Sequence, residues 1–384
     1  MKKIKGLTYI GVDDLDLDLF EGQYVIPEGV SYNSYILEDE KIAVFDAVDK
    51  RKIAQWLKNL DDALGDKTPD YLVVSHVEPD HSAGIMAFAA KYPTATVVGN
   101  SKIFAMIKRF YGGEFPNKLE VKDGDRLSLG TRELVFAATP MVHWPEVMMT
   151  YDTGAGILFS ADAFGKFGAL ATYDGDWTCE ARRYYFNIVG KHGVQVQAAL
   201  KKLSAFDVRV ICPLHGPVLD ENLGFYLGLY DTWSSYRSEE KGTFIAASSV
   251  YGNTMQAAKL LAEELESRGE KVSFADLARS DMAENVEDAF RYDKLVIAAP
   301  TLDMGIFPVA HEFILHLKAK NFKNRRVGFI ENGTWAPVAA KLMRQELEGQ
   351  SGMDFIPTVF TVPSSLPDNA DEIVSAMADE LLAD

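Results

Sequence analysis

Regular alternation of apolar strands and amphipathic helices after residue 242 restricts the fold more than any other feature of this chain. Apolar runs alternate with helical patterns, and the runs are TFIAASS, KVSFADL, KLVIAAP, RRVGFIEN and MDFIPTVF. Gly269 falls where the first helix, NTMQAAKLLAEELESRG, is expected to end. Over about 140 residues this rhythm is typical of a doubly wound parallel sheet with helices on both faces.

The preceding 235 residues have a less regular pattern. Short strands such as SYNSYILED, KIAVFDAV and YLVVSH are mixed with helical stretches such as KRKIAQWLKNLDDAL. This mixture favours a layered α/β sandwich. The charged stretch YRSEEKG at 236–242 interrupts the pattern and is expected to be a junction between domains 1–240 and 241–384.

Four potential metal ligands occupy six positions behind the apolar strand YLVV. They are His76, Glu78, Asp80 and His81. If residues 76–80 are extended, alternate side chains point the same way, so His76, Glu78 and Asp80 share a face. A turn that starts at Pro79–Asp80 then brings His81 to the same place.

Three further candidates, His143, Asp162 and His215, each end a stretch that begins as an apolar strand. Loops at strand ends are where rigid sheets present ligands. The combined set is too large for one ion and suits two ions with one bridging carboxylate. Because a carboxylate, Glu78, takes a place where zinc hydrolases usually have an imidazole, the set favours iron or manganese. Ligand type alone leaves the metal open.

A phosphate-binding loop is indicated by SSVYGNT at 248–254, between an apolar strand and a helix. The hydroxyls of Ser249 and Thr254 and the backbone N–H groups around Gly252 and Asn253 can surround a phosphate at a helix N-terminus. The stretch lacks the Gly-Lys-Ser/Thr ending of triphosphate loops and the Gly-x-Gly-x-x-Gly of dinucleotide sites. A mononucleotide therefore fits best, although a plain turn with a helix cap has the same pattern.

Two more loops, PTLDMGIFP at 300–308 and ENGTWAP at 331–337, leave strands on the side where such sheets bind ligands. Trp335 either stacks on a flat ring or is simply exposed. All three loops resemble the FMN site of flavodoxins, with Leu302–Asp303 in place of an aromatic–Asn pair. The resemblance implies FMN contacts from Ser249, Val250, Tyr251, Gly252, Asn253, Thr254, Pro300, Thr301, Leu302, Asp303, Gly305, Asn332, Gly333, Thr334 and Trp335.

The whole chain resembles the flavodiiron proteins, or A-type flavoproteins. The resemblance rests on His-x-Glu-x-Asp-His with His143, Asp162 and His215, and on the segments SYNSY, HWPE, FSADAFG and PLHG. It implies a metallo-β-lactamase-like αββα sandwich followed by a flavodoxin-like doubly wound parallel sheet. It also implies one iron held by His76, Glu78 and His143, a second held by Asp80, His81 and His215, and Asp162 as the bridge. Ala161 stands where many relatives have Cys, with little expected effect on ligation.

The resemblance implies a reductase of O₂ to water, of NO to N₂O, or of both, with no predicted preference. No catalytic side chain is predicted. Reduced FMN holds two electrons and two ferrous ions hold two more, which matches the four that O₂ needs. Cys179 and Cys212 form no Cys-x-x-Cys pair, so the electrons are expected from an external donor. A separate rubredoxin is the expected donor, with a reduced deazaflavin coenzyme as the alternative. A homodimer or homotetramer is expected, because head-to-tail pairing brings flavin and iron together in the family.

Composition restricts the partners and the location. A formal charge of −17 makes nucleic acid and anionic lipid poor partners. No apolar run reaches the ~18 residues that span a membrane. The N-terminus lacks the pattern of a signal peptide, so a cytoplasmic location is expected.

The sequence is also compatible with two other functions. The first is a metallo-β-lactamase-fold hydrolase, with zinc or iron, that uses a metal-bound hydroxide on a thioester or phosphodiester. Glu78 and the flavin loop argue against it. The second is an electron carrier with a vestigial metal site, and the complete ligand set argues against that.

Overall fold

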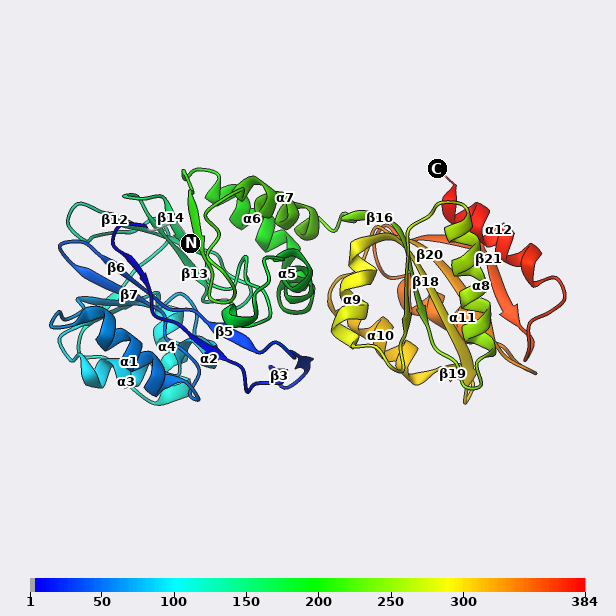
Figure 1. The fold of residues 1–384 in the computed structure, drawn as a ribbon, viewed down its shortest axis with the longest axis horizontal. Helices are drawn as coiled ribbons and strands as arrows, with labels where there is room; N and C mark the ends of the chain where they lie inside the picture. Colours follow the sequence, from blue (N-terminus) through cyan, green and yellow to red (C-terminus); the bar gives the residue numbers. More distant parts are fainter. Residues whose placement is uncertain (1–3, 384) are drawn as a thin grey trace. The chain divides into compact units, whose positions relative to one another are not determined.

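The computed structural model describes residues 4–383, and the chain divides into two compact units after Asp231 (Figure 1). The outermost residues of the two predicted domains, 1–3 and 384, lie outside the described part. The division falls inside helix α7 (Leu223–Ser234), a few residues before the predicted boundary at 240.

The first unit contains two main β-sheets. Their strand orders are β1-β6-β7-β8-β9-β10 and β11-β12-β13-β14-β15, and two small sheets pair β2 with β5 and β3 with β4. The strands are β1 (Leu7–Tyr9), β2 (Val12–Asp14), β3 (Leu19–Phe20), β4 (Tyr24–Val25), β5 (Val30–Tyr32), β6 (Tyr35–Glu38), β7 (Ile42–Phe45), β8 (Tyr71–Val73), β9 (Thr96–Gly99), β10 (Lys118–Glu120), β11 (Arg126–Ser128), β12 (Glu133–Ala138), β13 (Met148–Asp152), β14 (Ile157–Phe159) and β15 (Val210–Cys212).

The first unit also contains helices, most of which lie on the outer sides of these sheets (Figure 1). They are α1 (Ile53–Leu64), α2 (Pro79–Ser82), α3 (Ile85–Lys91), α4 (Ser101–Tyr111), α5 (Thr178–Tyr184), α6 (Gly193–Leu203) and α7, with a π-helical turn at Tyr185–Val189 and 3₁₀ turns at Leu170–Thr172 and Gly190–His192. In α1, Trp56, Leu60 and Leu64 recur every four residues and form its buried face.

The two sheets pack face to face through aromatic side chains. The rings of Phe45 on β7 and Phe159 on β14 stack with centroids 3.6 Å apart, and Tyr35 on β6 meets Phe159 edge-on at 5.8 Å. All three residues are at most 2% exposed. The predicted αββα sandwich is therefore confirmed.

The segment SYNSYILED, predicted as one strand, forms two strands in different sheets. β5 ends at Tyr32 and β6 begins at Tyr35, and between them the N–H of Asn33 donates to the Leu214 carbonyl at 2.8 Å instead of to a neighbouring strand. Its side-chain amide donates to the carbonyls of Pro213 and Gly216 at 2.8 and 2.7 Å. This contact fixes the loop that carries His215.

The second unit is a doubly wound parallel sheet, which confirms the prediction. Its strand order is β17-β16-β18-β20-β21, with the short β19 antiparallel to β18. The strands are β16 (Glu240–Ala247), β17 (Val272–Asp276), β18 (Tyr292–Leu302), β19 (Gly305–Ile306), β20 (Arg326–Asn332) and β21 (Asp354–Val362). The helices are α8 (Asn253–Ser267), α9 (Met282–Arg291), α10 (Pro308–Ala319), α11 (Ala339–Leu347) and α12 (Ala370–Leu382).

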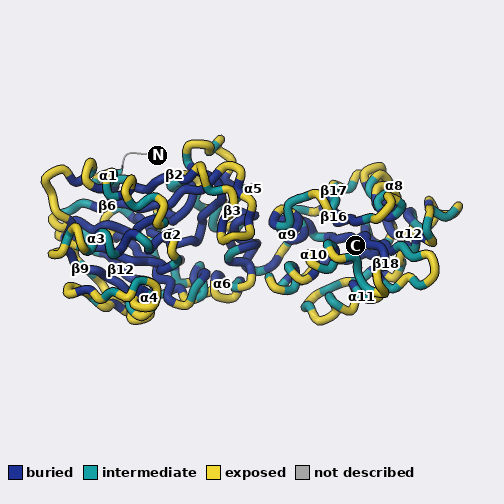
Figure 2. Tube along the Cα trace, turned by 90° about the horizontal axis from the view of Figure 1, so that it is seen from below, coloured by how far each residue is buried: buried dark blue, intermediate teal, exposed yellow. Residues whose placement is uncertain are grey.

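Burial in this unit follows the sheet (Figure 2). Ala257, Leu261 and Leu265 of α8 are fully buried in one cluster with Val296 of β18 and Phe360 of β21. Gly269 follows α8 with φ +85°, where a glycine costs least, so the predicted end of this helix is confirmed.

Candidate metal centre and flavin cavity

The turn His76–His81 is not extended throughout, so the prediction that His76, Glu78 and Asp80 share one face is wrong. Glu78 has extended dihedrals, φ −57° and ψ 139°, but the helix α2 begins at Pro79. Proline is favoured at the first helical position because its fixed φ suits a helix start. Asp80 and His81 therefore project from α2, whereas His76 and Glu78 project from the loop before it.

The other candidate ligands lie in loops that follow strands. His143 lies between β12 and β13, Asp162 follows β14 and His215 follows β15. β14 and β15 are parallel neighbours, with Phe159 opposite Cys212. Because both strands run the same way, the loops with Asp162 and His215 leave at the same edge of the sheet.

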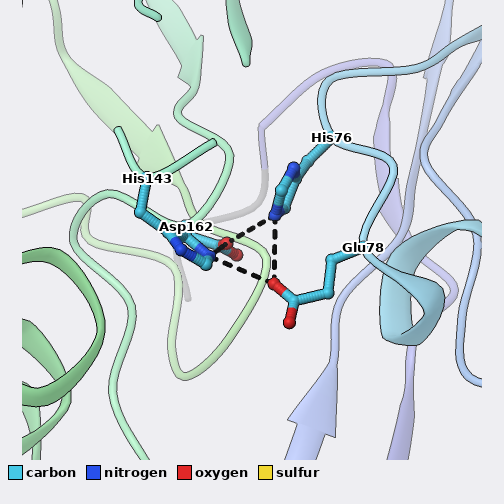
Figure 3. A group of neighbouring side chains, drawn as sticks. All are labelled: His76, Glu78, His143 and Asp162. Carbon is cyan, nitrogen blue, oxygen red and sulfur yellow. Dashed lines mark hydrogen bonds and ion pairs between the residues drawn. The ribbon is translucent and has the colours of Figure 1, made fainter. Parts of the chain in front are cut away.

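The first ligand group comprises His76, Glu78, His143 and Asp162 (Figure 3). The Glu78 Oε2 atom lies 3.2 Å from Nε2 of His76 and 3.1 Å from Nε2 of His143. The Asp162 Oδ2 atom lies 3.2 and 3.0 Å from the same two nitrogens. All four side chains thus converge on one point.

The second group comprises Asp80, His81 and His215. The Asp80 Oδ2 atom lies 3.3 Å from Nε2 of both histidines, and the two Nε2 atoms are 3.1 Å apart. The other oxygen of Asp162, Oδ1, lies 3.2 Å from Nε2 of His81 and 3.8 Å from Nε2 of His215. Asp162 therefore presents one oxygen to each group.

The chemistry of these donors fits a pair of cations. The carboxylates of Asp80 and Asp162 are buried, and oxygens of both lie 3.0–3.3 Å from imidazole nitrogens of the other candidate ligands. Burial opposes ionisation of Asp162, but His76, His143 and His81 hold its pKa well below the usual range. Two imidazole nitrogens 3.1 Å apart need a cation or a proton between their lone pairs. Nitrogen and oxygen donors of this kind suit iron, manganese or zinc.

In the metal-free protein, stability should fall between about pH 6.5 and 9. Burial lowers the pKa of His143, but hydrogen bonds to Asp162 and Glu78 outweigh it and raise the pKa to about 9. Since the unfolded value is ~6.5, protonated His143 stabilises the fold fully below that pH and loses this contribution as the pH rises through 9, about 3 kcal/mol in all. Bound metal needs the deprotonated ring, so loaded protein should lack this loss. Thermal melts of both forms across this range test the point, and a flat metal-free profile contradicts it.

Several residues around the metal ligands were not predicted as site residues. The Glu146 Oε1 atom lies 2.7 Å from Nδ1 of His76, and the Ser31 carbonyl lies 2.7 Å from Nδ1 of His215. These two residues lie in the segments HWPE and SYNSY, which carry part of the family resemblance. Membership in those segments could have identified them as site residues. Glu21, in the β3–β4 turn, lies close to Glu78, and no sequence pattern indicated this contact.

The second unit has a cavity of about 410 Å³. Twelve of its fifteen lining residues were predicted from the sequence; the lining comprises Ser249, Val250, Tyr251, Asn253, Thr254, Pro300, Thr301, Asp303, Met304, Asn332, Gly333, Thr334, Trp335, Ala336 and Ser364. The additional residues are Met304, Ala336 and Ser364. Ser364 lies in the loop after β21. Because parallel strands all end at one edge of the sheet, this loop could have been predicted to line the cavity as well.

Three predicted flavin contacts, Gly252, Leu302 and Gly305, are not part of the cavity wall. Gly252 caps α8 with φ +93°, and its N–H donates to Ser249 Oγ at 2.9 Å. Leu302 and Gly305 pair with each other at the end of the β18–β19 hairpin. Flavin contacts from these three residues stay predictions.

The shape and chemistry of this cavity fit FMN. The N-terminus of α8 at Asn253 offers backbone N–H groups for a phosphate. Tyr251 and Trp335, 93% and 87% exposed, provide flat rings along the wall. On the opposite loops, Ser364 Oγ donates to Thr334 Oγ1 at 2.8 Å and Asn332 Nδ2 donates to the Ser364 carbonyl at 3.1 Å.

Between residues 4 and 383, no helix combines the length and the apolar character that a bilayer crossing needs.

Two family models match the chain. Residues 30–216 match the ODP family beta lactamase model, and residues 244–356 match a flavodoxin domain model. The chain is 28% identical to the anaerobic nitric oxide reductase flavorubredoxin of Vibrio vulnificus over 86% of this chain and 69% of that protein. It is also 31% identical to diflavin flavoprotein A 1 of Synechocystis, over 78% of this chain, but spans only about half the length of that relative.

Solved structures resemble the complete chain. The flavodiiron protein of Giardia intestinalis has a TM-score of 0.90 and 26% identity, over 99% of this chain and 95% of that one. The rubredoxin oxygen:oxidoreductase of Desulfovibrio gigas has a TM-score of 0.91 over 99% and 97%, and at 24% identity it supports the fold. The two matched domains stand in the predicted order, and together they cover more than three quarters of the chain. The chain belongs to the flavodiiron protein family.

Proposed function

We propose that this chain passes electrons from an external donor through FMN to a di-iron centre that reduces O₂ to water, NO to N₂O, or both. FMN and two iron ions are its cofactors, and together they supply the electrons that these gases need. The observation that carries the proposal is the pair of ligand groups that share Asp162, in the same chain as the flavin cavity.

In this proposal, His76, Glu78 and His143 hold one iron, and Asp80, His81 and His215 hold the other. Asp162 would be shared by both ions, since its oxygens lie 3.0–3.2 Å from the first group's nitrogens and 3.2–3.8 Å from the second's. A metal pair held by these side chains would supply redox chemistry and binding positions for a diatomic gas. Tyr184 lies beside this site; burial, with Asp162, Glu78 and Asp80 nearby, raises the pKa of its hydroxyl. That hydroxyl stays protonated and is able to donate a hydrogen bond.

The proposal includes domains at 1–240 and 241–384, and FMN contacts from the predicted loops. An external donor is needed because the two cysteines are far apart in sequence and form no rubredoxin motif. We propose rubredoxin, which the name of the Desulfovibrio gigas relative supports. A homodimer or homotetramer that pairs flavin with iron, and a cytoplasmic location, complete the proposal.

A hydrolase would leave the flavin cavity and the complete Glu78-containing ligand set without a role. Anaerobic stopped-flow separates the alternatives. Protein loaded with iron and FMN is reduced, then mixed with O₂ or NO while the flavin absorbance is followed. The proposal predicts reoxidation much faster than that of free reduced FMN with at least one gas. Reoxidation at the rate of free flavin with both gases would contradict it and favour an electron carrier, and the ratio of the two rates gives the gas preference.

A further inference from the structure

The two ligand groups have equal sets of metal donors but unequal outer hydrogen bonds. Each group has two imidazoles, one carboxylate of its own and one oxygen of Asp162. In each ring Nε2 faces the carboxylates and Nδ1 is the far nitrogen. Any intrinsic difference between the ions therefore depends strongly on the hydrogen-bond partners of the Nδ1 atoms. Outer partners orient a ligating histidine and raise its basicity.

In the first group, His76 has a buried carboxylate as its outer partner. Glu146 is 0% exposed, and its Oε1 accepts from Nδ1 of His76 at 2.7 Å and from the N–H of Val77 at 3.0 Å. The segment around Glu146 is itself held in place, because Asn100 Nδ2 donates to the Glu146 carbonyl at 2.7 Å. The proton on Nδ1 directs Nε2 of His76 toward Glu78 and Asp162.

In the second group, no ring has a carboxylate at its far nitrogen. Nδ1 of His215 donates to the neutral carbonyl of Ser31 at 2.7 Å, and Nδ1 of His81 has no hydrogen-bond partner within residues 4–383. A carboxylate draws the Nδ1 proton more strongly than a carbonyl does, so His76 is the more electron-rich ligand.

We propose that Glu146 is a positioning residue that makes the ion of the His76 group the harder of the two to reduce. The inference rests on the proposed function, because it needs a di-iron pair. When one electron is added to the diferric pair, it reduces the ion held by Asp80, His81 and His215. A second electron then reduces the ion held by His76, Glu78 and His143. The pair therefore has two distinct one-electron couples, and the lower potential belongs to the His76 group.

The test is a redox titration of iron-loaded protein, followed by EPR, on Glu146→Gln. Glutamine keeps an oxygen for Nδ1 of His76 and the N–H of Val77 but removes the charge. The lower potential is expected to rise, while the higher one stays near its wild-type value. A tenfold loss of preference for the ferric form corresponds to about 59 mV in a one-electron couple.

Asp46→Asn is the matched control. Asp46 is 1% exposed, and its Oδ1 accepts from the N–H groups of Ser75 and His76 at 2.7 and 3.4 Å. It thus holds the same backbone as Glu146 without a hydrogen bond to a ring nitrogen. Because its carboxylate interacts electrostatically with His81 of the second group, this control should leave the lower potential in place. Glu146→Asp, which keeps the charge but shortens the reach, serves as a second variant and should give a smaller shift of the same couple.

A shift of the higher couple alone, equal shifts of both couples, or equal effects of Glu146→Gln and Asp46→Asn would each overturn the inference. Where Glu146→Gln does not fold, an unchanged lower couple in Glu146→Asp would overturn it too. Wild-type protein that holds no iron pair after iron loading would instead refute the proposed function. The two failures are therefore distinguishable.

Discussion

Replacing Asp162 with alanine is expected to abolish gas reduction while FMN stays bound. Among the side chains of residues 4–383, this carboxylate alone reaches both ligand groups, with Oδ2 3.0 Å from His143 and Oδ1 3.2 Å from His81. Without it the two ions lose their common ligand and part of their compensating charge. A rise of about 4 kcal/mol in the barrier lowers the rate roughly a thousandfold, and turnover should fall at least this far. The same loss of turnover, with FMN retained, is expected for His143→Ala.

Asp152→Ala is the matched control for this prediction. Asp152 is also fully buried in the first unit, but its carboxylate accepts from Arg132 and from the N–H groups of Gly154 and Ala155. This variant should lose thermal stability yet keep its iron and its turnover. Iron content, FMN content and gas consumption are measured on the same preparations. Loss of FMN from folded Asp162→Ala protein would contradict the assignment of the two cofactors to separate units.

Asn253→Asp is expected to remove FMN without unfolding the second unit. Asn253 is the first residue of α8 and lines the cavity. A carboxylate at a helix N-terminus stabilises the helix, but here it also meets the phosphate dianion. Two unit charges 4 Å apart at a protein surface repel by about 4 kcal/mol, so FMN affinity should fall at least about a hundredfold.

The control for this variant is Gln350→Glu, which adds the same charge to the same unit. Gln350 follows α11, beyond the helix end that lies farther from the cavity, and does not line it. Fluorescence titration of the metal-loaded apo-flavoprotein with FMN gives both affinities, and circular dichroism gives the fold. Equal FMN affinities for Asn253→Asp and Gln350→Glu would contradict the assignment of the α8 N-terminus to the phosphate site.

The second unit was the more predictable part of the fold for a physical reason. Its parallel strands are buried on both faces, so they read as continuous apolar runs between helices of ordinary length. β18 shows this, since residues 294–300 are all buried, and even Lys294 is only 9% exposed. The patterns did not predict α12, whose apolar positions follow a polar loop at 363–369.

The identity of the candidate ligands could be predicted from the sequence, but their grouping could not be derived from spacing. Spacing placed Asp80 with His76 and Glu78, and the early start of α2 at Pro79 instead turns Asp80 toward His81 and His215. The Glu146–His76 contact joins residues 70 positions apart, so local pattern contains no information about it. Asn33 likewise holds the His215 loop across more than 180 residues, and the same contact divides a segment that reads as one strand.

The most direct test is the metal and flavin content of the chain. Protein produced under iron-replete conditions is analysed for iron and zinc by mass spectrometry and for FMN by chromatography, in one sample. The proposal predicts two iron ions and one FMN per protein chain, with little zinc. A zinc-filled protein without FMN, after growth with ample iron and riboflavin, would contradict it.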